Sequence, residues 1–272
     1  MKVLLLSNSA PNYYHFFNAL VGLLANDGAE IAVAVDSAFS REENALDNLE
    51  FAPVHEFAAF FAAHKTDREI LERYAEFPLN AALLSNFERA EVYRTWDDSA
   101  DIDYFDRLKS ALLTFFEEIF DQYGTDTVLY ENVCDAFSQY ALFVAQRKGA
   151  AYYGLGGTRL PGRFQVTADP IADERIENNF KAIQGGQAIV DDAVRAWAAD
   201  YIAQIETVIP DYMKINRLDR LSLFGRYFRR DRLYKIASLL RHVSSSRTDN
   251  FQVGNPLRTH VNLFLRNVGR RL

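Results

Sequence analysis

The first 35 residues constrain the fold most strongly, because a strand, a helix and a second strand follow one another there. Residues 2–7 form a short apolar run rich in strand formers, and a polar turn separates this run from a segment with helical spacing. We expect that helix over residues 13–25, ended by Asn26-Asp27-Gly28, and the second strand over residues 30–35. Such a unit has a right-handed crossover, so its two strands are parallel.

The same alternation returns between residues 102 and 155. The pattern predicts a helix over 102–123, a strand over 127–130, a helix that ends near Gly149, and a strand over 151–155. Residues 58–90 read as helix in two pieces broken near Pro78. Strands separated by helices indicate an α/β fold with a doubly wound, mainly parallel Rossmann-like sheet over residues 1–170.

Strand signals are missing after residue 170. Helical spacing predicts one long helix over 189–209, a basic aromatic helix over 221–243 and a final basic helix over 256–271. We therefore expect residues 171–272 to form a helical, basic extension or interdomain connector.

Charge divides the chain into two unequal parts. Residues 1–211 hold 16 Lys and Arg against 34 Asp and Glu, a net charge of −18, whereas residues 212–272 hold 14 against 3, a net charge of +11. The acidic body argues against nucleic acid as a partner. The basic part fits an anionic partner, a lipid head-group layer, or an acidic face of the same molecule.

Apolar runs are all far shorter than the roughly 20 residues of a membrane-spanning helix. The apolar start at residues 1–6 is interrupted by polar residues before it reaches the length of a signal-peptide core. We expect a cytoplasmic protein that could also be peripheral at the inner membrane. The single cysteine, Cys134, allows no intramolecular disulfide and no cysteine cluster for a metal.

Three segments follow the carboxyl ends of predicted strands, where open parallel sheets bind ligands. The first lies around the start of the first helix and offers the hydroxyl and amide groups of Ser7, Asn8, Ser9 and Asn12. Capping and turn formation are the alternative roles for these side chains. His15 could act as an acid or base from the first helical turn.

The second segment is Glu131-Asn132, directly after the strand over 127–130. A carboxylate near the following helix N-terminus stays ionised, so Glu131 could serve as acceptor, general base or cation stabiliser. A simple capping role is the alternative.

The third segment is glycine-rich and carries two arginines. Its candidate binding groups are Gly156, Gly157, Thr158, Arg159 and Arg163, because glycines allow close approach of a ligand and guanidinium groups suit phosphate or carboxylate. The spacing matches no nucleotide-binding fingerprint, and a glycine-rich connection with solvated arginines is the alternative.

The sequence contains no clear motif for a metal site or for a serine hydrolase. His55 and His64 lack a carboxylate at metal-ligand spacing, and no Gly-x-Ser-x-Gly elbow is present. We therefore expect no metal, no cofactor and no serine hydrolase chemistry.

A family resemblance rests mainly on residues 130–164. Tyr130-Glu131-Asn132, Phe137, the strand at 152–155 and the segment 158–164 resemble the N-terminal half of bacterial capsular polysaccharide biosynthesis proteins, which are GT-B glycosyltransferases. Residues 2–15 resemble the first strand and loop of that domain. Asn255-Pro256-Leu257 with its basic helix resembles the connector to the second domain.

The resemblance implies the acceptor-side half of a glycosyltransferase that builds a surface polysaccharide or extends a lipid-linked acceptor. It implies that Glu131 and His15 face the cleft and that Arg159 and Arg163 lie near an anionic group. The nucleotide-sugar donor would bind a second domain beyond this chain, so we expect one half of a longer or split enzyme. Residues 221–243 could then recruit it to a membrane surface.

Two other functions stay open from the sequence. The chain could be a noncatalytic α/β module that docks a partner through its basic helices. It could also belong to a polymer phosphotransferase of similar plan.

Overall fold

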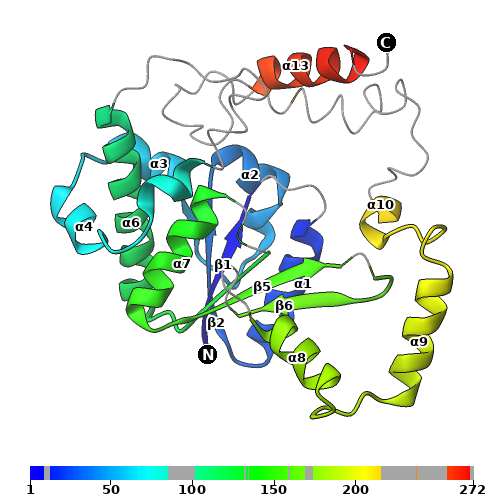
Figure 1. Ribbon diagram of the computed structural model, residues 1–272. Helices are drawn as coiled ribbons and strands as arrows, with labels where there is room; N and C mark the ends of the chain where they lie inside the picture. Colours follow the sequence, from blue (N-terminus) through cyan, green and yellow to red (C-terminus); the bar gives the residue numbers. More distant parts are fainter. Residues whose placement is uncertain are drawn as a thin grey trace.

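The structure is a computed structural model with one six-stranded sheet at its centre (Figure 1). It describes residues 1–8, 13–84, 102–131, 133, 135–158, 160–168, 174–215, 237 and 256–269. The strands lie in the order β3-β2-β1-β4-β5-β6. Their bounds are β1 (Lys2–Ser7), β2 (Glu30–Val35), β3 (Val54–Glu56), β4 (Thr127–Tyr130), β5 (Ala151–Gly157) and β6 (Phe164–Thr167).

The first five strands run parallel, and β6 alone is antiparallel. The order reverses between β1 and β4, since the chain moves outward from β1 to β3 and then returns to the other side of β1. The predicted doubly wound, mainly parallel Rossmann-like sheet is therefore confirmed.

Both faces of the central strands are buried. In β1, Leu4 and Leu6 pack into one apolar layer, whereas Val3 and Leu5 pack into the other. Because side chains alternate between the faces of a strand, a continuous apolar run is what a doubly covered parallel strand requires.

Helices cover the two faces unequally (Figure 1). Helix α1 and the short 3-10 helix η1 contribute to the layer under Val3 and Leu5, and α3, α4, α6 and α7 contribute to the layer under Leu4 and Leu6. The bounds are α1 (Tyr13–Asn26), α2 (Ala38–Glu43), η1 (Leu46–Asn48), α3 (Phe57–Ala63), α4 (Arg68–Arg73), α6 (Ile102–Tyr123) and α7 (Ala136–Lys148).

The predicted helices at the start of the chain and over 102–123 are confirmed, as is a strand from residue 151, but the number of helical pieces after residue 57 is wrong. Residues 58–84 form three helical pieces rather than two, because Asp67 begins α4 as an N-cap after the break at residues 64–66. The strand expected at 151–155 continues to Gly157 and returns as β6, so the glycines lie in a hairpin strand.

The described residues after 173 are helical or irregular. They form α8 (Arg175–Gln184), α9 (Asp192–Ala203), α10 (Asp211–Ile215) and α13 (Pro256–Gly269). The long helix expected over 189–209 is wrong, because it starts only at the Asp191 cap and ends at Gln204. The final basic helix is confirmed, and the helix expected over 221–243 lies outside the described residues.

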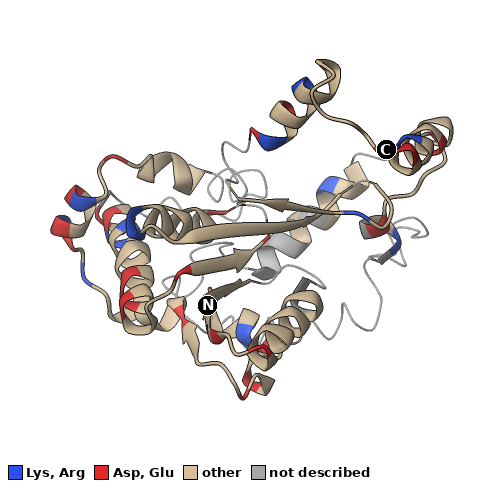
Figure 2. Cartoon of the chain, turned by 90° about the horizontal axis from the view of Figure 1, so that it is seen from below, with Lys and Arg blue, Asp and Glu red and all other residues tan. Residues whose placement is uncertain are grey.

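None of the helices within the described ranges is long and apolar enough to cross a membrane. Among the described residues, Asp and Glu are distributed over several helices and loops around the sheet (Figure 2).

Candidate functional site

The three predicted segments meet at the carboxyl edge of the sheet. The Asn8 side-chain amide, just after β1, donates to Asp135 Oδ2 at 3.1 Å, so the β1 loop touches the N-terminus of α7. This bond crosses the point where strand order reverses, which is where open α/β sheets bind ligands. The structure thus places the loop after β1 beside the N-terminus of α7, four residues beyond Glu131.

The third segment joins the same edge through aromatic and hydroxyl contacts. Phe16 follows His15 on α1, and its ring stacks on that of Phe164 at the start of β6, with centroids 5.6 Å apart. The hydroxyl of Tyr152 in β5 donates to the backbone carbonyl of Glu131 at 3.3 Å. Helix α1, the end of β4 and the β5–β6 hairpin therefore share one rim.

Glu131 lies half-buried directly after β4, five residues before the first residue of α7. This is the placement that the sequence predicts, at the end of a central strand. His15 lies exposed on the first turn of α1.

Ser7 and Asn8 lie deeper than expected. Ser7 is buried, and its Oγ accepts a hydrogen bond of 2.6 Å from the Asn44 side-chain amide. The same amide donates to the Asn8 carbonyl, also at 2.6 Å. Asn44 therefore fixes the end of β1 and the start of the loop that follows it.

The turn between β5 and β6 is stabilised by hydrogen bonds among its own residues. Thr158 Oγ1 lies 3.1 Å from the Leu160 carbonyl and 3.0 Å from the Arg163 carbonyl, so it closes the tip. The Arg163 guanidinium lies 4.9 Å from the ring centroid of Trp197 in α9. A cation over an aromatic ring is attracted by the ring quadrupole, so Arg163 also ties the hairpin to the helical segment.

Several predicted residues lie outside the described residues: Ser9, Asn12, Asn132 and Arg159. Gly156 and Gly157 are described and lie in β5, opposite Gln165 and Phe164 of β6. A Cβ at Gly157 would meet nothing within 4 Å, so the backbone there is open to a ligand.

A buried carboxylate that the sequence did not single out lies beneath this rim. Asp36 directly follows β2 and is 4% exposed. Burial raises its pKa to about 7, hydrogen bonds from Ser40 and Ser37 oppose the rise, and the negative charge of Asp135 adds to it. The position of Asp36 directly after a predicted strand could have identified it as a candidate site residue. No local sequence pattern could have identified Asn44.

Asn44 should contribute measurably to stability. Its Oδ1 has no hydrogen-bond partner in the described part of the chain, but its amide makes two buried bonds. We expect Asn44→Ala to lower the free energy of unfolding by roughly 2 kcal/mol, since the Asn8 carbonyl and Ser7 hydroxyl lose their donor. Urea denaturation measures this change.

Asn80→Ala is the matched control, because exposed Asn80 makes one bond to Lys109. A cost well below 1 kcal/mol is expected there. Equal losses in both variants would contradict the structural role of Asn44.

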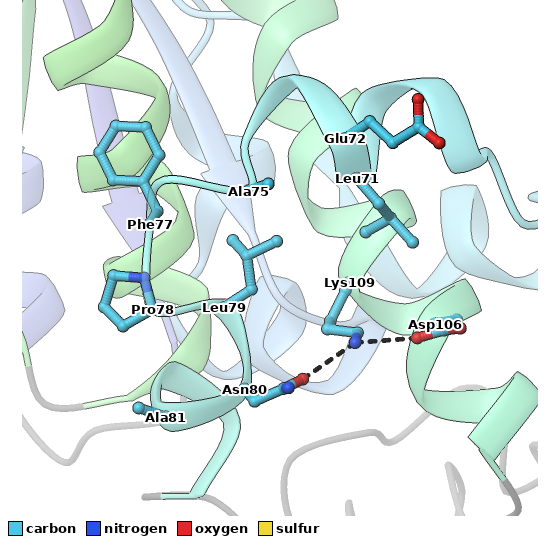
Figure 3. Close-up of a pocket in the computed structure, with 10 residues that line it drawn as sticks. All are labelled: Leu71, Glu72, Ala75, Phe77, Pro78, Leu79, Asn80, Ala81, Asp106 and Lys109. Carbon is cyan, nitrogen blue, oxygen red and sulfur yellow. Dashed lines mark hydrogen bonds and ion pairs between the residues drawn. The ribbon is translucent and has the colours of Figure 1, made fainter.

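A cavity of about 450 Å³ lies elsewhere, beside α4 and α6 (Figure 3). On the polar side of this cavity, Lys109 forms an ion pair of 2.8 Å with Asp106 and donates a hydrogen bond of 2.9 Å to Asn80. None of the predicted site residues lines it. Among the described residues, no three His, Cys, Asp or Glu side chains gather as a metal site.

Comparison with known proteins adds little beyond the fold. No protein-family model and no curated protein matches the chain. A similar solved structure is that of the glycosyltransferase VinC in complex with DTDP, with 17% identity and a TM-score of 0.31. The match covers 74% of this chain and 43% of that protein, so this chain spans less than half its length. Strand order and register define the class, a Rossmann-like α/β fold.

Proposed function

We propose that this chain is the acceptor-side half of a glycosyltransferase that moves a sugar from a nucleotide-sugar donor to a surface polysaccharide or lipid-linked acceptor. The observation that carries the proposal is the Asn8–Asp135 bond, which places the β1 loop beside the N-terminus of α7, the helix that follows Glu131. Two polar segments at the strand-order reversal form the place where this fold class binds ligands. The resemblance of residues 130–164 to capsular polysaccharide glycosyltransferases supports the same reaction.

In this proposal Glu131 takes the proton from the acceptor hydroxyl. The freed oxygen forms a bond to the anomeric carbon of the donor, and the bond from that carbon to the nucleotide diphosphate breaks, with its electron pair leaving on the diphosphate. A half-buried carboxylate directly after a central strand is a suitable general base for a hydroxyl bound at this edge of the sheet. His15 on the first turn of α1 is the second group that could serve as base.

Replacing Glu131 by glutamine should lower the transfer rate about a hundredfold, because the amide keeps the shape of the side chain but cannot accept a proton. Transfer is measured with the complete natural protein that contains this chain, using radiolabelled sugars on several nucleoside diphosphates. His15→Asn, made separately, shows whether the imidazole is the base instead.

Glu69→Gln serves as the control, since Glu69 lies exposed on α4 outside the site. Its transfer rate should equal that of the unchanged protein. Unchanged turnover in the Glu131 and His15 variants would refute the proposed base. A complete protein that binds and turns over no sugar nucleotide, yet retains a protein partner, would favour the noncatalytic module.

A further inference from the structure

Residues 174–209, which we name the arm, carry apolar side chains that nothing in the described structure covers. Neither α8 nor α9 has a buried residue. Phe180 is 58% exposed and Ile202 is 65% exposed. The exposed large apolar side chains of the two helices are Ile176, Phe180, Ile183, Val194 and Ile202.

In the contacts described, the arm meets the body at its first turn and at one residue of α9. Arg175 donates to the Val166 carbonyl of β6 at 2.6 Å, and Trp197 lies under Arg163. Figure 1 shows α8 and α9 projecting from the sheet on the β6 side. Helices of 10 and 12 residues are marginal alone in water, so packing against a partner is needed to stabilise them.

The negative charge of the arm favours a partner with a positively charged surface. Residues 174–209 contain six Asp and Glu against three Lys and Arg, a net charge of −3. An anionic lipid surface or nucleic acid would be repelled. A basic surface with apolar side chains would be attracted.

Helix α13 has the complementary properties. Residues 256–272 contain four arginines and no Asp or Glu, and Val261 and Leu265 share one exposed face at a spacing of four residues. In Figure 1, α13 lies across the top of the molecule, whereas α8 lies near the bottom. The complementary surfaces of one chain therefore lie apart.

We propose that α13 of a second copy of this chain packs on the arm, and that the contact is made reciprocally in a twofold symmetric dimer. In such a dimer, α13 of each chain contacts the arm of the other chain, so the same contact is made twice. The two contacts cover the apolar surfaces of the arm and α13 and pair their opposite charges, as the isologous contacts of closed dimers do. The dimer does not depend on the proposed transferase reaction.

Light scattering of the full chain should give twice its mass of 31.1 kDa at micromolar concentration. Phe180→Asp on the arm and Leu265→Asp on α13 should each shift the mass to that of one chain. Leu23→Asp is the matched control, because Leu23 is 64% exposed on α1, outside both surfaces, and this variant should stay dimeric. Arg258→Glu combined with Arg266→Glu should raise the dimer Kd at least about tenfold.

Cross-linking tests which surfaces meet. In a Cys134→Ser background, Ile183→Cys and Leu265→Cys are placed on separate chains, mixed, and treated with a short bis-maleimide. A product that contains one chain of each kind, formed only in the mixture, supports the reciprocal contact. A monomeric unchanged chain, a dimer without this product, or cross-linking within single chains would each overturn it, as would monomers bound to anionic vesicles through α13.

Discussion

Phe137→Ala should lower the free energy of unfolding by about 3–5 kcal/mol, the cost of removing a large buried aromatic side chain and leaving a cavity. Phe137 lies fully buried on α7. Its ring centroid is 4.9 Å from that of Phe116 on α6 and 6.1 Å from that of Phe57 on α3. The side chain therefore joins three helices on one face of the sheet, and these helices can close only partly over the space.

Urea denaturation followed by far-UV circular dichroism measures the loss. The matched variant is Phe164→Ala, because Phe164 is 68% exposed and stacks only on Phe16 in the described contacts. That change should cost about 1 kcal/mol. Equal shifts of the two midpoints at unchanged slope would mean that the aromatic cluster does not carry the stability of this face.

Four of the five parallel strands were predictable, and the three-residue β3 was missed, because a long apolar run can be recognised locally in the sequence and a three-residue strand cannot. A strand buried on both faces needs a continuous apolar run, and Val3, Leu4, Leu5 and Leu6 supply it next to a turn and a helix. The crossover then fixes the direction of the next strand. Composition and spacing are sufficient for this part of the fold.

The hairpin of β5 and β6 was missed because its turn depends on one side chain. Thr158 Oγ1 accepts from the Leu160 amide at 3.0 Å and lies close to the Arg163 carbonyl, which brings the strands together without a short Asn-Gly or Asp-Gly signal. The alternation of residues 164–167 was visible in the sequence, but four residues are a weak strand signal.

The positions of the candidate segments along the chain were predictable. Residues that follow strands can be located from sequence, and this placed Asn8, Glu131 and residues 156–163 after the ends of expected strands. Asn44 could not be found in this way, because it meets Ser7 across 37 residues of chain at the end of a short helix. Contacts of that kind follow from tertiary packing and leave no local pattern.

Asp36→Asn should make the protein more stable by up to about 4 kcal/mol at pH 8 and leave it nearly unchanged near pH 4. Folding raises the pKa of Asp36 from 3.8 to about 7, mainly by burial, and three pKa units correspond to about 4 kcal/mol. Between these two pH values the folded state binds a proton that the unfolded state has lost, so the unchanged protein loses stability as pH rises from 4 to 7. The asparagine side chain carries no charge, and the Ser37 and Ser40 hydroxyls can turn to bond it.

The measurement is the difference in free energy of unfolding between variant and unchanged protein across this pH range. Burial lowers the pKa of His55 and of His64, so both make stability rise with pH, but they are present in both proteins and cancel in the difference. Asp135→Asn keeps the oxygen that caps α7 and removes the neighbouring charge, but it replaces Oδ2, which accepts from the Asn8 amide, by a donor. It should therefore give a smaller pH-dependent change of the same sign, together with a loss of stability that does not depend on pH. A stability difference that stays constant from pH 4 to pH 8 would mean that Asp36 titrates alike in the folded and unfolded chains, and that the rim is not built over a buried acid.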